Sequence, residues 1–139
     1  MKKTTPDYSS LFYNIPLPSW VYNLLTFEIL DVNHEALRHY GYTKEEFLSF
    51  SLKDLRPKEE IPQLMAAQKI IKIDNQNNYL GVFTHQKKSG EKIRMKINGH
   101  KLKYGGISSM MVVCQDVTAE EEQLRLLKES EIHLNAAVA

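Results

Sequence analysis

The feature that most constrains the fold is a nearly uninterrupted apolar stretch at residues 107–115. A strand of this composition belongs in the middle of a sheet with both faces covered, because surface strands alternate apolar with polar residues. The pair Gly105-Gly106 precedes the stretch and predicts a turn. A second turn at residues 87–90 separates two further strand-like stretches. We therefore expect three consecutive antiparallel strands between residues 79 and 115.

The middle strand of these three changes phase along its length. Apolar side chains occupy the odd positions from 93 to 97, whereas the next two occupy even positions, Leu102 and Tyr104. Successive residues of a strand point to opposite faces, so this slip would move apolar side chains to the other face. Gly99 lies at the slip, and a glycine inside a strand often marks an extra residue. We predict a β-bulge there.

The first part of the chain predicts a short helix and a β-hairpin. Asp7 can cap a helix at residues 8–13. Two stretches rich in aromatic and branched residues, 20–24 and 28–32, then predict strands joined by a short link. These two strands must join the later three in one sheet if their apolar faces are to be buried.

Several helix signals lie between the hairpin and the last three strands. Asn33 and Gly41 are residue types that begin and end helices, and Thr43 with Glu46 has the spacing of a capping box. An amphipathic pattern predicts a longer helix at residues 59–71. The fold class is therefore α+β, with a five-stranded antiparallel sheet and short helices on one face.

Composition limits the function classes. The 139 residues suit one soluble domain, and a net charge of +1 gives no general attraction to nucleic acid or membranes. The single cysteine, Cys114, excludes an internal disulfide. No apolar run approaches the roughly 20 residues that span a bilayer. We expect no membrane contact within this chain and a cytoplasmic location, and a membrane anchor elsewhere in a longer protein stays open.

A different pattern begins at residue 119 and predicts a C-terminal helix. Apolar residues occupy the a and d positions of a heptad repeat, with Glu131 as a polar exception. They are Leu124, Leu127, Leu134 and Val138. This pattern predicts a parallel coiled coil, and hence a homodimer. The alternative is a single amphipathic helix packed on its own domain.

Asp116 and Thr118 connect the last strand to this helix. Thr118 is a good N-cap residue, and Glu121 three residues later completes the spacing of a capping box. Asp116 can accept charge-assisted hydrogen bonds from a basic side chain or from backbone N–H groups.

Taken in order, six motifs of the chain resemble a PAS domain, the sensory-box module of bacterial signalling proteins. They are residues 11–22, 32–36, 40–47, 54–57, 85–90 and 116–118. The resemblance divides the chain into an N-terminal tail (1–7), a PAS sensor domain (8–118) and a linker or signalling helix (119–139). It also implies a longer two-component protein, in which a histidine kinase or a further PAS domain follows.

The resemblance implies roles for particular residues. Asp116 and Thr118 match the pair that braces the exit of PAS domains, so a signal would pass through them. Five residues match positions of the family's pocket: Tyr22, Asn33, Tyr40, His100 and Met110. A pocket of this kind takes a small-molecule ligand, which the sequence does not identify. The alternative is a filled core without a ligand.

The two best-known PAS cofactors are not supported. Haem-binding members place a histidine on the pocket helix, and residues 59–71 contain none. Light-sensing flavin members need a cysteine in an Asn-Cys-Arg motif, where this chain reads Asn33-His34-Glu35. Cys114 is interpreted as a small core residue. The cofactor, if there is one, is unknown.

No pattern predicts catalysis. The chain has no phosphate-binding glycine loop, no nucleophile elbow and no metal-ligand spacing. Catalytic residues and metal ligands are therefore not assigned, and lysines on strands favour protection of sheet edges over nucleic-acid binding. We expect a non-catalytic sensing and dimerisation module of a sensor histidine kinase. The alternative is a constitutive interaction or spacer module that binds no ligand.

Overall fold

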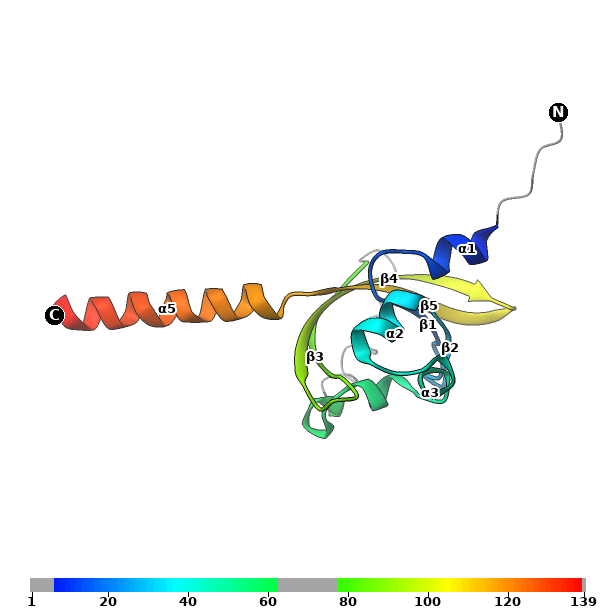
Figure 1. The fold of residues 1–139 in the computed structure, drawn as a ribbon, viewed down its shortest axis with the longest axis horizontal. Coiled ribbons are helices and arrows are strands. Elements are labelled where there is room, and N and C mark those ends of the chain that lie inside the picture. Colours follow the sequence, from blue (N-terminus) through cyan, green and yellow to red (C-terminus); the bar gives the residue numbers. More distant parts are fainter. Residues whose placement is uncertain (1–6, 63–77, 139) are drawn as a thin grey trace, which may run out of the picture.

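The computed structural model describes residues 7–62 and 78–138. A five-stranded antiparallel sheet with the order β2-β1-β5-β4-β3 forms its centre. The strands are β1 (Ser19–Asn23), β2 (Ile29–Val32), β3 (Tyr79–Gln86), β4 (Lys92–Tyr104) and β5 (Ile107–Asp116). The apolar strand β5 is central, between β1 and β4, as its composition predicted (Figure 1).

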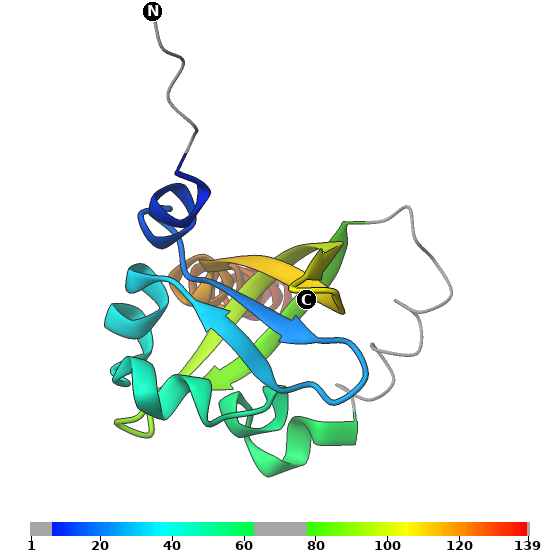
Figure 2. The same cartoon turned by 90° about the vertical axis from the view of Figure 1, so that its right-hand side faces the viewer.

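Short helices lie on one face of this sheet (Figure 2). They are α2 (His34–Tyr40), α3 (Lys44–Leu48) and the 3-10 turns η1 (Leu52–Leu55) and η2 (Lys58–Glu60). The predicted capping box of Thr43 and Glu46 is present, and Gly41 ends α2 at φ 83°, a conformation that glycine adopts most readily. The α+β prediction is confirmed. Most of the predicted helix at 59–71 lies outside the described residues.

The core lies between the inner face of the sheet and these helices. Alternate strand residues contribute Trp20, Tyr22, Phe83, Ile93, Met95, Ile97, Met110, Val112 and Cys114. The helices and turns contribute Ala36, Tyr40, Phe47, Leu52 and Leu55. The ring centroids of Trp20, Tyr40 and Phe47 lie 5.7–5.9 Å apart. Burial of each large side chain contributes about 1.5–3 kcal/mol, so this layer is the main source of stability.

The predicted bulge at Gly99 is wrong. Strands β4 and β5 pair in one continuous register along their shared length. The irregularity lies in β3 instead, between Tyr79 and Gly81. Gly99 has another use, because a Cβ there would lie 3.0 Å from Met110 Sδ and 3.1 Å from Met111 O. Neighbouring atoms therefore approach too closely for a side chain.

The change of phase in β4 arises because its two halves are covered on different faces. Residues up to Ile97 alternate into the inner core, whereas Leu102 and Tyr104 line a groove on the outer face. Phe12 of helix α1 (Tyr8–Tyr13) and Met111 of β5 line the same groove. Met111 remains partly exposed, so the outer face of β5 is less covered than its composition predicted.

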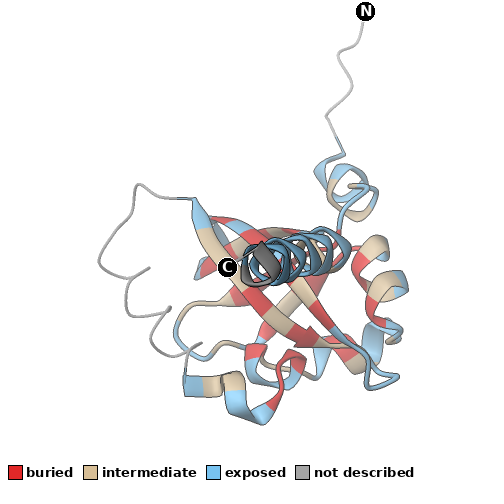
Figure 3. Cartoon of the chain, turned by 90° about the vertical axis from the view of Figure 1, so that its left-hand side faces the viewer, coloured by how far each residue is buried: buried red, intermediate tan, exposed pale blue. Residues whose placement is uncertain are grey.

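The C-terminal helix α5 (Thr118–Val138) extends away from the sheet as a separate rod (Figure 1). Leu124, Leu127 and Leu134 are 52, 68 and 65% exposed, and the helix surface is exposed along its length (Figure 3). The side chain of Val138 lies outside the described part. The alternative of a helix packed along its own domain is therefore wrong for this conformation.

Candidate functional site

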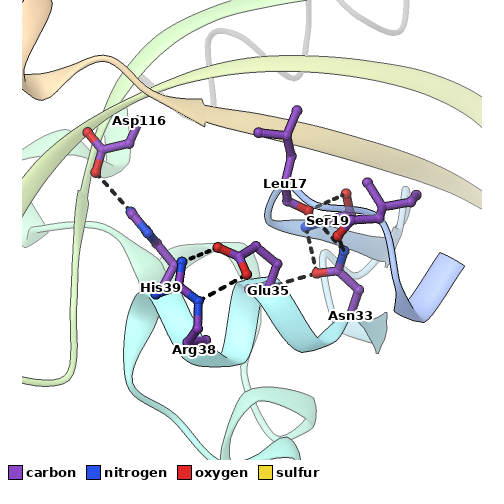
Figure 4. A network of polar contacts seen from close by, with 9 residues as sticks. Leu17, Ser19, Asn33, Glu35, Arg38, His39 and Asp116 are labelled. Atoms are coloured by element: carbon purple, nitrogen blue, oxygen red, sulfur yellow. Dashed lines mark hydrogen bonds and ion pairs between the residues drawn. The ribbon is translucent and has the colours of Figure 1, made fainter.

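The carboxylate of Asp116, the last residue of β5, contacts two helices. Its Oδ2 lies 2.8 Å from Nε2 of His39, near the end of α2 (Figure 4). Its Oδ1 accepts hydrogen bonds from the backbone N–H and the hydroxyl of Thr118, at 2.9 and 2.5 Å. One side chain thus bridges a helix that packs on the core to the first turn of α5. Since 77 positions separate His39 from Asp116, only the tertiary fold brings them together.

Electrostatics keep this carboxylate charged. Burial by itself would raise the pKa of Asp116, but hydrogen bonds from Thr118 and His39 outweigh burial. The pKa consequently lies below its ordinary value of 3.8. At neutral pH the contacts of Asp116 are charge-assisted and hence stronger than neutral ones. The prediction that Asp116 accepts such hydrogen bonds is confirmed.

The predicted capping box of Thr118 and Glu121 is wrong. Helix α5 begins at Thr118 itself, and the N–H of Glu121 donates to Val117 O at 2.9 Å. The Thr118 hydroxyl accepts from the N–H of Arg94 at 2.9 Å instead. Glu121 Oε2 accepts from Arg94 Nε at 2.7 Å. Both polar side chains of the expected box are therefore engaged by Arg94 of β4, a partner that local spacing does not reveal.

Arg94 also anchors the junction within the sheet. Its Nη1 donates to Thr84 Oγ1 on β3 at 2.9 Å, and its carbonyl accepts from the N–H of Val117 at 2.9 Å. The first turn of α5 is therefore connected to β3, β4 and β5, and through His39 to α2. We call the group Asp116, Thr118, His39, Arg94 and Glu121 the exit junction.

Asn33 positions the start of α2, the helix that carries His39 (Figure 4). Its Oδ1 accepts from the N–H groups of Ser19 and Ala36, both at 3.0 Å. Its Nδ2 donates to the carbonyls of Ile15 and Leu17, at 3.2 and 2.9 Å. Asn33 was predicted to line a pocket. Its amide is instead fully engaged by backbone groups, which makes it a positioning residue.

The remaining predicted pocket residues separate into two groups. Tyr22, Tyr40 and Met110 lie together in the inner core. The prediction is wrong for His100, whose side chain is exposed. The physical reason is parity: the inner-facing positions of β4 are odd-numbered as far as Gly99, so position 100 belongs to the outer face.

Two polar side chains meet in the middle of the aromatic core. Tyr40 Oη lies 2.6 Å from His85 Nδ1, and both residues are buried. Burial, reinforced by the charge of Arg56, holds the pKa of His85 well below 6.5, so this imidazole is neutral. Burial raises the pKa of Tyr40 well above 10. A neutral, hydrogen-bonded pair of this kind is compatible with an apolar interior.

This arrangement of sheet, helices and exit junction can be compared with known proteins. A sequence model of the PAS domain family matches residues 16–119, which include the entire sheet. The chain belongs to the PAS domain family. No curated protein sequence matches the chain.

Solved PAS domains share its fold at low sequence identity. A PAS domain from a two-component sensor histidine kinase has 18% identity and a TM-score of 0.67, covering 78% of this chain and 92% of that chain. A domain of a sensory box sensor histidine kinase/response regulator from Geobacter sulfurreducens has 22% identity and a TM-score of 0.61, covering 78% and 90%. The PAS domain of a LuxR-family transcriptional regulator from Burkholderia thailandensis, in complex with ethanol, has 15% identity and a TM-score of 0.67, covering 81% and 98%.

PAS domains are sensory modules, so family membership places this chain among sensing domains. Within residues 7–62 and 78–138, no group of three or more His, Cys, Asp and Glu residues could hold a metal ion. None of the helices in those ranges is both long and apolar enough to cross a bilayer.

Three residues that contact buried or charged groups in the fold were not identified from the sequence. His39, His85 and Arg56 were not assigned to any site, yet each is a partner or neighbour of a buried or charged group. The sequence could have identified His85, because it lies two positions after Phe83 in β3 and alternate residues of a strand point to the same face. No sequence signal pairs His39 with Asp116, since helix and strand meet only through the path of the chain.

Proposed function

We propose that this chain is the signal-sensing and dimerisation PAS domain of a cytoplasmic signal-transduction protein, in which a histidine kinase or a further PAS domain follows α5. The observation that carries the proposal is the double contact of Asp116, which binds His39 of α2 and Thr118 of α5. A shift of α2 against the sheet changes the geometry of this carboxylate. The first turn of α5 then responds, because the side chains of Thr118 and Glu121 are bonded to other members of the exit junction.

Dimerisation through α5 is the second part of this proposal. The exposed leucines of the helix recur at heptad spacing, and exposed apolar stripes of this kind are usually covered by another surface. A second copy of α5 would cover them in a parallel coiled coil. A change at the exit junction would alter the pairing of the two helices and be transmitted to the domains beyond them.

The first test uses Asp116→Ala in the full-length protein. We expect the variant to fold, since Asp116 lies at the periphery of the core, and to lose coupling between signal and output. Output is measured as autophosphorylation of the full protein with and without its stimulus, and near-ultraviolet circular dichroism checks the fold. Glu122→Ala, at an exposed position of α5, is the matched control. Wild-type signalling by Asp116→Ala contradicts a role for the exit junction.

The second test concerns self-association. A chain truncated after Thr118 loses the heptad leucines and is expected to sediment as a smaller species than the complete chain. The matched variant Leu124→Asp/Leu127→Asp retains the helix length but charges the apolar stripe, and it should behave like the truncation. An unchanged sedimentation profile removes the argument for a coiled coil.

The alternative of a constitutive spacer rests on the close mutual contacts of Trp20, Tyr40, Phe47 and His85. A spacer would signal independently of any bound molecule. Native mass spectrometry of the purified chain discriminates the two functions, since it reports bound small molecules and oligomeric state together. A spacer gives a ligand-free dimer whose melting temperature no small molecule changes.

A further inference from the structure

Arg56 is a buried cation, and two of its nitrogens have no bonding partner within residues 7–62 and 78–138. It follows η1 and is only 9% exposed. Its Nε and Nη1 are both buried and make no hydrogen bond. The guanidinium carbon lies 4.2 Å from the centroid of the Phe83 ring, so the side chain is held over an aromatic face. An arginine in such a position normally has its N–H groups bonded to an anion or to carbonyl oxygens.

Within the described ranges, Arg56 forms no ion pair with the chain itself. Glu60 acts on it only as a more distant charge. Burial lowers the pKa of Arg56 to about 10, so the guanidinium stays charged at neutral pH. A buried charge without a partner is strongly unfavourable, so a compensating group is needed beyond the described residues.

A second unpartnered donor lies in the same core. The Nε1 of Trp20 is buried and makes no hydrogen bond. The Trp20 ring lies 5.7 Å from the Tyr40 ring and 5.9 Å from the His85 ring, between centroids. The charge of Arg56 acts on both Tyr40 and His85. Arg56 and Trp20 therefore both lie near the same buried pair, and among the described residues their buried N–H groups lack an acceptor.

We propose that this core binds the carboxylate of a small organic acid, with Arg56 compensating its charge and the Trp20 N–H as a further donor. The inference rests on the proposed sensing function and names the ligand class. A single negative charge matches one guanidinium, since His85 is neutral. A phosphate dianion would leave a charge uncompensated. The surrounding Phe83, Trp20 and Tyr40 rings suit an apolar or aromatic body, so the predicted class is an apolar monocarboxylic acid.

The chain contains a built-in reporter for this site, because Trp20 is its single tryptophan. The experiment titrates the full chain with phenylacetate and hexanoate, and with the uncharged phenylacetamide and hexanamide, while tryptophan fluorescence and melting temperature are recorded. Inorganic phosphate is titrated in parallel. We expect at least one acid to change the fluorescence and to raise the melting temperature in a saturable manner. The amides and phosphate should do neither.

Variants locate the binding. Arg56→Gln should weaken the affinity for the acid at least about tenfold, because hydrogen bonds to charged groups are the strong ones. Arg38→Gln is the matched control, since Arg38 is an exposed arginine of α2 that pairs with Glu35, and it should bind like the wild type. Glu60→Gln should also leave the affinity unchanged.

The outcomes separate clearly. Three results overturn the proposal: equal effects of acid and amide, a response to phosphate alone, or no response to either acid. These measurements use the wild type, so they test the proposal even if Arg56→Gln does not fold. Binding that appears only in Glu60→Gln shows that Glu60 is the partner of Arg56 in solution, which also overturns it. A negative result here leaves the Asp116→Ala test of the sensing function intact. Conversely, if the acid binds and Asp116→Ala signals like the wild type, the proposed role of the exit junction is contradicted and the proposed ligand class is supported.

Discussion

The inner core and the exit helix α5 contain similar apolar side chains in opposite environments. Trp20, Tyr40 and Phe47 are at most 1% exposed, and their rings pack against one another. Leu127 and Leu134 of α5 are 68 and 65% exposed. In the core, each apolar side chain gains stability from its own chain. In α5, the same kind of side chain gains almost nothing until another surface covers it.

The difference shows which part of the domain is stabilised by its own contacts and which part is not. Most helical stability in proteins comes from packing of an apolar face, and the apolar face of α5 is exposed. The core needs no partner for its apolar groups, whereas α5 is held at its first turn by the exit junction. In the proposed mechanism, a small change at that junction therefore has a large effect on a weakly held helix.

The largest expected effect separates the two regions directly. Phe47→Ala leaves a cavity under α3 and should lower the free energy of unfolding by about 3–5 kcal/mol. Leu127→Ala at an exposed position should change it by less than about 0.5 kcal/mol. Chemical denaturation at low protein concentration measures both. Comparable losses for the two variants would mean that α5 packs on the domain in solution.

The next effect is a pH dependence confined to the core. The pKa of His85 is depressed in the folded state, so below pH 6.5 the unfolded chain takes up a proton that the folded chain does not. The free energy of unfolding should therefore fall as the pH decreases below 6.5, by up to about 1.4 kcal/mol per pH unit. His85→Gln should flatten this slope. His100→Gln, at an exposed position, should retain it.

A profile of unfolding free energy between pH 5 and pH 7.5 measures this slope, within the range where histidine titrates. The result that contradicts the buried His85 is a slope shared by His85→Gln and the wild type. That result would mean that other groups cause the loss of unfolding free energy at low pH, and it would remove the argument for a neutral Tyr40–His85 pair.

The smallest of these effects concerns the exit junction. Asp116→Asn keeps the size of the side chain but removes its charge, and should lower the free energy of unfolding by about 0.5–1.5 kcal/mol. Because the folded pKa of Asp116 is lowered, the contribution of this carboxylate is present above pH 3.8 and lost as the pH falls through the folded pKa.

Thermal unfolding at pH 7 and at pH 3 checks the prediction, since the difference between Asp116→Asn and the wild type should shrink at the lower pH. Glu122→Gln, which removes an exposed carboxylate paired with Arg125, is the control and should have little effect at either pH. An equal loss in both variants would indicate that Asp116 contributes no more than a surface charge.

Local features of the fold were predictable because their causes are local. The helix start at Asn33, the capping box of Thr43 and Glu46, and the central position of β5 all follow from residue types at short spacing. The errors have a common origin. Gly99 and Thr118 carry local signals for a bulge and a capping box, but tertiary neighbours decide their actual roles.

The candidate sites were only partly predictable for the same reason. Asp116 was identified as an acceptor, but its partner His39 was not. Tyr22, Tyr40 and Met110 were predicted to line a pocket, and they lie together in the inner core, whereas His100 was assigned to the wrong face. Arg56 gave no signal, because an arginine beside a proline resembles an ordinary surface residue until its burial is known.

The sequence by itself determined the order of the elements, the α+β class and the heptad pattern of the exit helix, because hydrophobic periodicity and capping residues act over a few positions. Only the tertiary structure decided which polar groups meet. His39 contacts Asp116, Arg94 donates to Thr118, and Arg56 is buried without an ion-pair partner among the described residues, because distant segments converge on one sheet. Such contacts depend on the path of the whole chain, which no local pattern encodes.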